Sequence, residues 1–311
     1  MSYYHLPVLL NEVIAGLSPK RGESFIDCTI GGGGHAVAIL QRTAPLGRLL
    51  GLDCDGQAII AARENLTPFK ERVTLINDSY LYLTDHALAH SFTEVAGILF
   101  DLGFSSPQLA DPARGFSFQI KAPLDLRYNT AAGTPAWQML TQWSVKELTE
   151  VLRDYGEVPQ AGRLARAIIN EQRLVPLTTT AELLAIVDRV QGKGRRSLPA
   201  ATLVWQALRI AVNNELKQLQ ETLPQTLPLL APGGRLAIIS FHSGEDRVVK
   251  NWLRRESTDC LCPPSSPICR CGHRASLKLI TQRPITPSAA EVKNNSRARS
   301  AKLRLAVKLP D

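Results

Sequence analysis

Four consecutive glycines, Gly31 to Gly34, constrain the fold of this chain most strongly. They follow a short apolar run that begins at Ser24 and is typical of a buried strand, and they precede a helix-like segment that begins at His35. A second apolar run ends in Asp53, 22 residues after Gly31. This order is typical of a βαβ unit in which a ligand lies against bare backbone and the acid accepts hydrogen bonds from a ribose diol. The sequence therefore predicts a nucleotide-type pocket.

The glycines do not identify the ligand. Gly31, Gly33 and Ala36 satisfy a loose G-x-G-x-x-A pattern, so that a dinucleotide and S-adenosylmethionine both fit this half of a site. A glycine-rich turn without a ligand is the structural alternative, but four successive glycines lower stability unless something needs the room. The cofactor has to be decided from the rest of the chain.

Short apolar segments alternate with helical ones in the first third of the sequence. Strands are expected at 24–29, 48–53, 72–77 and 95–101, and helices at 7–17, from His35 onward and at 55–66. Such alternation indicates an α/β fold with a parallel sheet that is covered on both faces. A further buried strand is expected at 230–241, after a Pro-Gly-Gly turn.

A helical insertion separates the fourth expected strand from the fifth. The pairs Ser144–Glu147 and Thr179–Glu182 form capping-box patterns before apolar helical segments, and a longer third helix is expected at 199–220. The insertion is expected to recognise the substrate. The predicted boundaries are 1–107 and 214–311 for the cofactor-binding domain and 108–213 for the inserted α-helical domain.

Two strand patterns occur late in the chain. Residues 277–281 are largely apolar, and residues 300–308 alternate apolar with basic side chains, as a strand with one solvated face does. Together they predict an antiparallel hairpin at the edge of the sheet. By analogy at the level of the fold, this ending is typical of a class I methyltransferase, whereas a nicotinamide-binding sheet continues by right-handed βαβ units.

Size and charge narrow the classes of protein. A chain of 311 residues with 44% hydrophobic residues can bury a substantial core. No window approaches the roughly 18 apolar residues that a membrane span needs, and no signal-like start is present, so that a cytoplasmic protein is expected. Residues 247–311 contain 14 Lys and Arg against 4 Asp and Glu. This excess indicates a polyanionic substrate. The alternative explanation is that the basic side chains only keep the surface soluble.

Four of the six cysteines crowd into twelve residues. Cys260-x-Cys262 and Cys269-x-Cys271, followed by His273, offer enough soft ligands for a tetrahedral zinc ion, although Cys-x2-Cys is the usual spacing. Free thiols in a reducing compartment and a redox-labile loop are the alternatives. The four cysteines are therefore candidate zinc ligands.

The chemistry is expected where the parallel strands end. In an open α/β sheet, ligands bind beyond the carboxyl ends of the strands. The glycine loop, Asp53, the segment from Asp78 to Tyr80 and the segment from Asp101 to Gln108 should therefore border one pocket.

Long motifs accompany these loops. They are Gly33-Gly34-His35, Asp101-Leu-Gly-x-Ser-Ser-Pro-Gln-Leu109, Arg114-Gly-Phe-Ser-Phe118, Pro123-Leu-Asp125, Tyr155-Gly-Glu157, Pro232-Gly-Gly234, Ile239-Ser-Phe-His-Ser243, Glu245-Asp-Arg247 and Arg297-Ala-Arg-Ser300. In these motifs the chain resembles the RsmH (MraW) family over nearly its whole length. The resemblance implies a bacterial S-adenosylmethionine-dependent methyltransferase that acts on the N4 amine of a decoding-site cytidine in 16S ribosomal RNA of the small subunit. Gly244 departs from the pattern, which has a larger apolar residue there.

Matching positions carry the family's cofactor site onto this sequence. The residues that the resemblance places there are Gly33, Gly34, His35, Asp53, Tyr80, Asp101 and Gln108. The glycine amides would admit the methionine end, Asp53 would accept from the ribose, and Tyr80 would lie over or beside adenine. Asp101 and Gln108 would face the sulfonium. His35 is expected to pack or to hydrogen-bond rather than to act as a general base.

Methylation of an exocyclic amine depends mostly on positioning, because the nitrogen lone pair must turn toward the methyl group. Asp101, Ser105 and the backbone around Pro107 are the candidate catalytic groups that would accept a hydrogen bond from the amine. The usual Asp/Asn/Ser-Pro-Pro-Tyr/Phe signature is replaced by Ser-Ser-Pro-Gln, which leaves the contacting group open. No cysteine lies between Asp101 and Ser240, which argues against methylation at C5.

The target cytosine must enter a closed pocket, so that single-stranded or flipped-out RNA is expected. The candidate phosphate-binding residues are Lys193, Arg195, Arg196, Arg297, Arg299 and Lys302. Phe116, Phe118 and Trp143 could stack on bases, but aromatic residues at helical or turn positions are more often part of the core.

Two other classes of function stay open. One is an RNA-binding assembly factor that keeps the cofactor fold without turnover. The other is a nicotinamide-dependent oxidoreductase, which would leave the segment from Asp101 to Gln108 unexplained. The sequence does not decide between a monomer and a homodimer.

Overall fold

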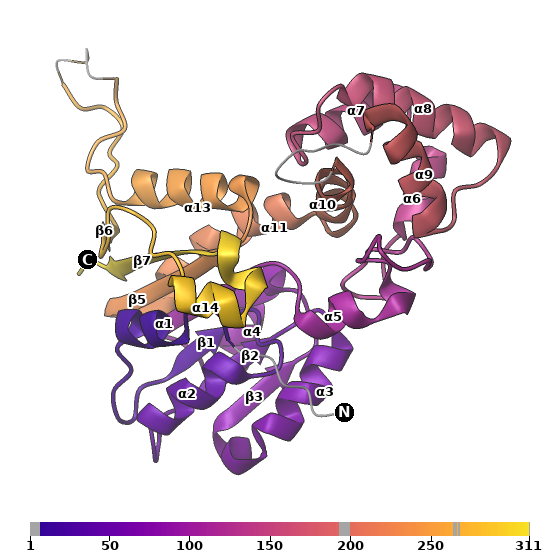
Figure 1. Ribbon diagram of the computed structural model, residues 1–311. Coiled ribbons are helices and arrows are strands. Elements are labelled where there is room, and N and C mark those ends of the chain that lie inside the picture. The colour runs from indigo at the N-terminus through magenta and orange to yellow at the C-terminus, as the bar shows by residue number, and fades with distance from the viewer. Residues whose placement is uncertain (1–6, 193–199, 264–265, 267, 311) are drawn as a thin grey trace. The chain divides into compact units, whose positions relative to one another are not determined.

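The computed structural model describes residues 7–192, 200–263, 266 and 268–310. The chain divides into two compact units (Figure 1). The sheet unit comprises Met1–Gly103 and Leu216–Asp311, and the helical unit comprises Phe104–Glu215. The contacts thus place the borders after Gly103 and after Glu215, beside the 107/108 and 213/214 borders that the sequence predicts. Among the described residues, no helix has the length and apolar character needed to cross a bilayer.

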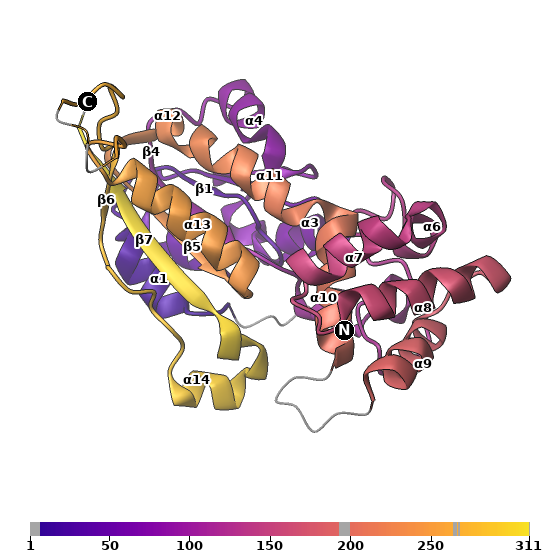
Figure 2. The same ribbon diagram turned by 90° about the horizontal axis from the view of Figure 1, so that it is seen from above.

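Within the described residues, the sheet unit contains a seven-stranded sheet in the order β3-β2-β1-β4-β5-β7-β6. The strands are β1 Phe25–Asp27, β2 Leu49–Leu52, β3 Val73–Ile76, β4 Val95–Asp101, β5 Leu230–Ser240, β6 Leu277–Leu279 and β7 Lys302–Lys308. Strands β1 to β5 pair in parallel, and β7 is antiparallel to both β5 and β6. Figure 2 shows β7, in yellow, running beside β5. The predicted α/β fold of the class I methyltransferase type, with its antiparallel hairpin, is confirmed.

Helices cover both faces of this sheet because neighbouring strand residues point to opposite sides. Phe25 and Leu49 pack in a core with α1, α2 and α3, whereas Ile26 and Leu50 pack in a core with α4, α11, α12 and α13. All four side chains are buried, as the apolar runs predict. The helices are α1 Leu10–Leu17, α2 Gly34–Arg42, α3 Gly56–Asn65, α4 Leu83–Ala89, α11 Glu215–Thr222, α12 Thr226–Leu229, α13 Ser243–Glu256 and α14 Ala289–Asn294.

The parallel strands bring five loops together at their carboxyl ends. Asp27 of β1 pairs in register with Leu99 of β4, and Asp101 of β4 pairs with Ile239 of β5. The loops that follow β1 to β5 therefore leave from the same side of the sheet, where a parallel sheet ordinarily binds its ligand.

The helical unit has a core of its own. Its helices are α5 Ser106–Ala110, α6 Ala136–Gln142, α7 Val145–Asp154, α8 Ala161–Leu174, α9 Thr180–Gln191 and α10 Ala200–Asn213. Leu148, Leu164 and Leu183, from α7, α8 and α9, are fully buried in that core. Both predicted capping boxes are present, at the starts of α7 and α9.

One expectation for this part of the chain is wrong. The helix expected at 199–220 is interrupted at Asn214, whose φ of 51° lies in the left-handed region and ends α10. The aromatic residues pack within the unit, as the more frequent role of such residues predicts. Phe116 lies 5.6 Å from the ring of Phe104, and Phe118 meets Trp205 edge-on at 5.4 Å. Trp143 is partly buried against the same core.

Candidate functional site

The loop between β1 and α2 ends in consecutive glycines, so that this part of its backbone is not covered by side chains of its own. Gly31 and Gly33 have φ angles of 49° and 81°, which favour glycine. A Cβ placed on Gly31 would find its nearest contact, the Thr29 carbonyl oxygen, only at 3.9 Å, so that there is room beside this residue. Gly34 is needed for a different reason, because its Cβ would collide with the ring of Pro7. Packing thus explains part of the glycine run, and open space beside Gly31 remains for a ligand.

Asp53 holds the loops after β1 and β2 together. Its Oδ2 accepts a hydrogen bond from the Gly31 N–H at 2.9 Å, and its Oδ1 accepts one from the Asp55 N–H at 2.9 Å. Asn77, after β3, donates its side-chain N–H to the Asp53 carbonyl oxygen at 2.9 Å. Each carboxylate oxygen can accept two hydrogen bonds. The carboxylate is therefore positioned by backbone and retains the chemistry to accept from a diol.

Two carboxyl groups lie at the carboxyl ends of β1 and β4, where Asp27 is buried and Asp101 is partly buried. Burial raises the pKa of Asp27 from 3.8 to about 7, although the Thr29 N–H bond opposes this shift and the charge of Asp53 adds to it. Burial also raises the pKa of Asp101 well above its ordinary value, and the charges of Asp27 and Glu245 act in the same direction. Acids with raised pKa values in one place are a feature of functional sites.

Asp101 combines a fixed backbone with an unsatisfied side chain. Its N–H donates to Thr29 Oγ1 at 2.6 Å, which anchors the end of β4 to the loop after β1. Its Oδ1 is buried and has no hydrogen-bond partner among the described residues. A buried polar atom of this kind is costly unless a ligand or water satisfies it.

His35 stands between Asp101 and the start of the chain's first helix. Its Nε2 lies 3.0 Å from the Val8 carbonyl oxygen, so that Nε2 carries the proton and donates. Its Nδ1 lies 3.8 Å from Asp101 Oδ2. This arrangement agrees with a hydrogen-bonding role for His35.

The loop after β3 contributes Asp78 and Tyr80. Asp78 accepts from the Ser79 N–H at 2.7 Å, and its Oδ2 lies 2.9 Å from Nε2 of His86. The Tyr80 ring meets Phe100 of β4 edge-on, with the ring centroids 5.8 Å apart. Tyr80 is thereby held against β4.

The motif Ile239-Ser-Phe-His-Ser243 spans the end of β5, the loop after it and the start of α13. His242 is the N-cap of α13 and forms a capping box with Glu245, whose Oε2 also accepts from the Phe241 N–H at 2.8 Å. These bonds assign His242 a structural task at the strand exit. They also hold the buried Glu245, which sequence reasoning missed, within electrostatic range of Asp101.

Three of the predicted site residues belong to the helical unit. The Ser105 N–H donates to Gln108 Oε1 at 2.8 Å, and the Gln108 N–H donates to Ser105 Oγ at 3.4 Å. Pro107 lies in α5, and Gln108 is buried. Their approach to Asp101 stays a prediction.

The predicted phosphate-binding residues divide into two groups. Lys193, Arg195 and Arg196 lie outside the described residues. Arg297 and Arg299 are exposed in the short 3-10 helix Ser296–Ser300 of the sheet unit. Lys302 lies with its Nζ 3.3 Å from Asp246.

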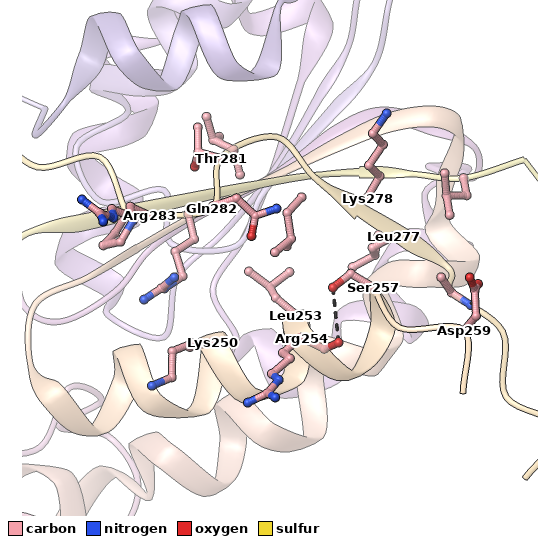
Figure 3. A pocket seen from close by; sticks show the side chains of 16 residues that line it. Lys250, Leu253, Arg254, Ser257, Asp259, Leu277, Lys278, Thr281, Gln282 and Arg283 are labelled. Atoms are coloured by element: carbon pink, nitrogen blue, oxygen red, sulfur yellow. Dashed lines mark hydrogen bonds between the residues drawn. The ribbon is translucent and has the colours of Figure 1, made fainter. Parts of the chain in front are cut away.

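Sequence reasoning also missed a basic groove of about 700 Å³ between α13, β6 and the segment after β6 (Figure 3). Leu253 and Leu277 lie in its wall. The cationic residues that line it are Lys250, Arg254, Lys278, Arg283 and Arg304. The first four are exposed, whereas Arg304 donates to Asp246 at 2.7 Å. The i, i+4 spacing of Lys250 and Arg254 was the available signal, because it puts both on one helix face.

The four clustered cysteines lie away from the strand ends, in the loop between α13 and β6, and all four are free thiols. Their Sγ atoms gather within 4.8 Å of one another.

Comparison with known proteins identifies the family. The MraW methylase family model matches residues 2–309. The ribosomal RNA small subunit methyltransferase H of Thermomicrobium roseum is 48% identical over 309 residues, which cover 99% of this chain and 95% of that protein. The protein of the same name from Heliobacterium mobile is 44% identical over 320 residues, covering 99% and 100%. A solved rRNA methylase from Streptococcus thermophilus aligns with a TM-score of 0.43 at 12% identity, covering 99% of this chain and 100% of that one. The family match and the two sequence identities together show that this chain belongs to the MraW methylase family.

Proposed function

We propose that this protein transfers a methyl group from S-adenosylmethionine to the N4 amine of a decoding-site cytidine in 16S ribosomal RNA of the small subunit. The names of the relatives supply the substrate class, since both are called ribosomal RNA small subunit methyltransferase H. The motif resemblance supports the N4 amine and the decoding site. In the molecule itself, the observation that carries the proposal is the buried, unsatisfied carboxyl oxygen of Asp101 at the end of β4.

The residues at the strand ends suit this cofactor. When bound, S-adenosylmethionine supplies an electrophilic methyl group on a positively charged sulfur. The open side of Gly31 would give room for its methionine part, and Asp53, whose Oδ2 accepts from the Gly31 N–H, would accept from its ribose hydroxyls. The carboxyl group of Asp101 would offset the positive charge. A nearby cation favours the ionised form of a carboxyl group, so that Asp101 would lose its proton on binding.

Ionised Asp101 would then act on the amine. A hydrogen bond from the amine to Oδ1 turns the nitrogen lone pair away from the base ring. Bound S-adenosylmethionine would supply the methyl group, and its carbon–sulfur bond would break as the nitrogen–carbon bond forms. The nitrogen would then carry a positive charge and release one proton, which Asp101 would accept at Oδ1. Its raised pKa in the absence of a positive ligand then favours the protonated form, which completes the transfer.

The deciding experiment combines three substrates with one readout. Purified protein is incubated with methyl-labelled S-adenosylmethionine and with bare 16S RNA, unmodified small subunits or free cytidine, and the digested products are separated as nucleosides. We expect N4-methylcytidine from the RNA or the subunits and none from free cytidine. Asp101→Asn should lower the rate by about 100-fold or more, the usual weight of a positioned proton acceptor. The exposed Asp85 provides the matched control, because Asp85→Asn should label at the normal rate.

Other products would contradict the proposal in different ways. Label in 5-methylcytidine or in a ribose methyl group would refute the N4 assignment. Bound cofactor without any methylated product would favour a non-catalytic assembly factor. Full activity of the Asp101→Asn protein would remove Asp101 from the mechanism.

A further inference from the structure

We propose that Cys260, Cys262, Cys269 and Cys271 bind one structural zinc ion through four thiolates. The residues lie in the loop that connects α13 to β6, at a site separate from the strand-end loops. Each contributes one Sγ atom, and the four atoms lie within 4.8 Å of one another. Thiolates are the ligands that structural zinc sites prefer.

The sulfur separations fit a shared ion. A zinc–thiolate bond of about 2.3 Å places two ligands of a tetrahedral site about 3.8 Å apart. The Sγ atoms of Cys260 and Cys269 are 3.3 Å apart, those of Cys269 and Cys271 are 3.6 Å apart, and those of Cys271 and Cys260 are 3.8 Å apart. A disulfide needs about 2.05 Å. Three sulfurs thus form one face of a small tetrahedron, and Cys262 supplies the fourth corner.

Backbone N–H groups point at the sulfurs in a reciprocal way. Leu261, between the first two cysteines, donates its N–H to Cys271 Sγ at 3.3 Å. Arg270, between the other two, donates its N–H to Cys262 Sγ at 3.3 Å. Such bonds offset the negative charge that four thiolates bring to a divalent ion. The short Cys-x-Cys spacing is what lets each segment donate to the other.

The loop needs a cross-link to be ordered. None of the described residues in 258–276 is buried or belongs to a helix or strand. Its apolar side chains do not form a core, since Leu261 is 43% exposed and Ile268 is 69% exposed. The ends are tied, because the Ser276 N–H donates to the Glu256 carbonyl oxygen at 2.8 Å. A metal ion is the usual way to fold a segment that cannot bury apolar surface.

His273 is not one of the ligands. Its Nε2 lies 2.9 Å from the Arg255 carbonyl oxygen, and this bond fastens the loop to the end of α13. The ligand set is therefore the four cysteines. The loop also bounds the basic groove, because Asp259 and Ala275 line that groove and are joined by a hydrogen bond of 3.3 Å.

The test measures metal and thiols in the same full-length protein, purified under reducing conditions without a chelator. We expect about one zinc ion per chain by elemental analysis, the stoichiometry of a closed structural site. Denaturation with a chelator but no reductant should then allow all six cysteines to be alkylated. Zinc below about a tenth of an equivalent after incubation with zinc salt would refute the site. Disulfide-linked cysteines in the fresh protein would refute it as well.

Variants separate the ligands from their neighbours. The double variant Cys260→Ser with Cys271→Ser should lose the zinc and exchange the amide hydrogens of 258–276 faster, while the strands keep their protection. His273→Ala and Cys54→Ser are the matched controls and should retain the metal. Loss of zinc from His273→Ala would contradict the four-cysteine assignment. Cobalt in place of zinc should give the visible absorption of a tetrahedral thiolate site, and its absence would count against the geometry.

Discussion

The protonation state of Asp101 is sensitive to its surroundings. Its carboxyl group is partly buried at the end of β4, with Oδ1 fully enclosed, and the charges of Asp27 and Glu245 add to the effect of burial in raising its pKa. A cation beside a carboxyl group favours its ionised form, so that a positive ligand here should lower the pKa that burial raises. The protonation of this one residue should therefore report which ligand occupies the site.

We expect S-adenosylmethionine to release a proton from the protein when it binds, and its affinity to rise with pH until Asp101 is ionised in the free protein. S-adenosylhomocysteine has a neutral thioether and should release fewer protons. Calorimetry in buffers of different ionisation enthalpy counts the protons directly. Asp101→Asn should remove the difference between the two ligands, and Asp85→Asn should keep it. Equal proton counts for both ligands with the unchanged protein would contradict the role given to Asp101.

Asp27 makes a separate prediction about stability. Its pKa is raised from 3.8 to about 7, so that the unfolded chain ionises this acid at lower pH than the folded chain does. Stability that is fully present below pH 3.8 is therefore lost as the pH rises toward 7, and no more is lost above that. At 1.36 kcal/mol for each pH unit, the loss is at most about 4 kcal/mol.

Asp27→Asn should flatten this dependence, because the amide stays neutral and can still accept from the Thr29 N–H through Oδ1. Urea unfolding at about pH 5 and about pH 8 measures the change, and the variant should gain most at the higher pH. Asp85→Asn serves as the surface control. Parallel pH profiles for the Asp27 variant and the unchanged protein would show that the acid does not titrate in this range.

Among the elements, α13 and β6 both contribute to the wall of the basic groove. Exposed cations of both line the basic groove, and Leu253 and Leu277 lie in its wall. Each phosphate that a protein neutralises releases counterions and steepens the dependence of binding on salt. The groove is therefore expected to contact the RNA backbone.

Arg254→Glu combined with Lys278→Glu should weaken binding to small-subunit RNA at every sequence and lower the salt slope by about 2, one for each lost contact. The control with the same change in net charge is Lys20→Glu with Lys70→Glu, at exposed positions outside the groove. Binding curves at several salt concentrations give the slopes. An unchanged slope for the groove variant, or an equal loss in the control, would show that the groove does not touch phosphate.

Local patterns predicted the elements well where one short stretch of chain decides the outcome. The boxes at Ser144 and Thr179 are local hydrogen-bond exchanges, and both are present. The break at Asn214 was not predicted, because the apolar spacing continues across it and only one backbone angle changes. The basic groove was missed because its residues are far apart in the sequence. They come together only when the sheet forms, so that no short stretch of sequence contains the groove.

At the scale of the molecule, two hydrophobic cores on the sheet and one in the helical unit divide the structure. The positions of the strands along the chain and the interruption between β4 and β5 could be predicted, since runs of apolar residues and the lack of them are visible in sequence. The electrostatic pairing of Asp101 with Asp27 and Glu245 could not be predicted from sequence, because it depends on the depth to which each carboxyl group is buried.

The position of β7 bears on how the protein is made. This strand occupies the inside of the sheet, and its Leu303, Leu305 and Ala306 are buried, although it is synthesised after every other strand. Until residues 302–308 have left the ribosome, β5 has an open edge and β6 has no neighbour to join. During that time the uncovered edge of β5 can pair with strands of other chains. The sheet is complete only when β7, the last strand to be synthesised, has inserted between β5 and β6.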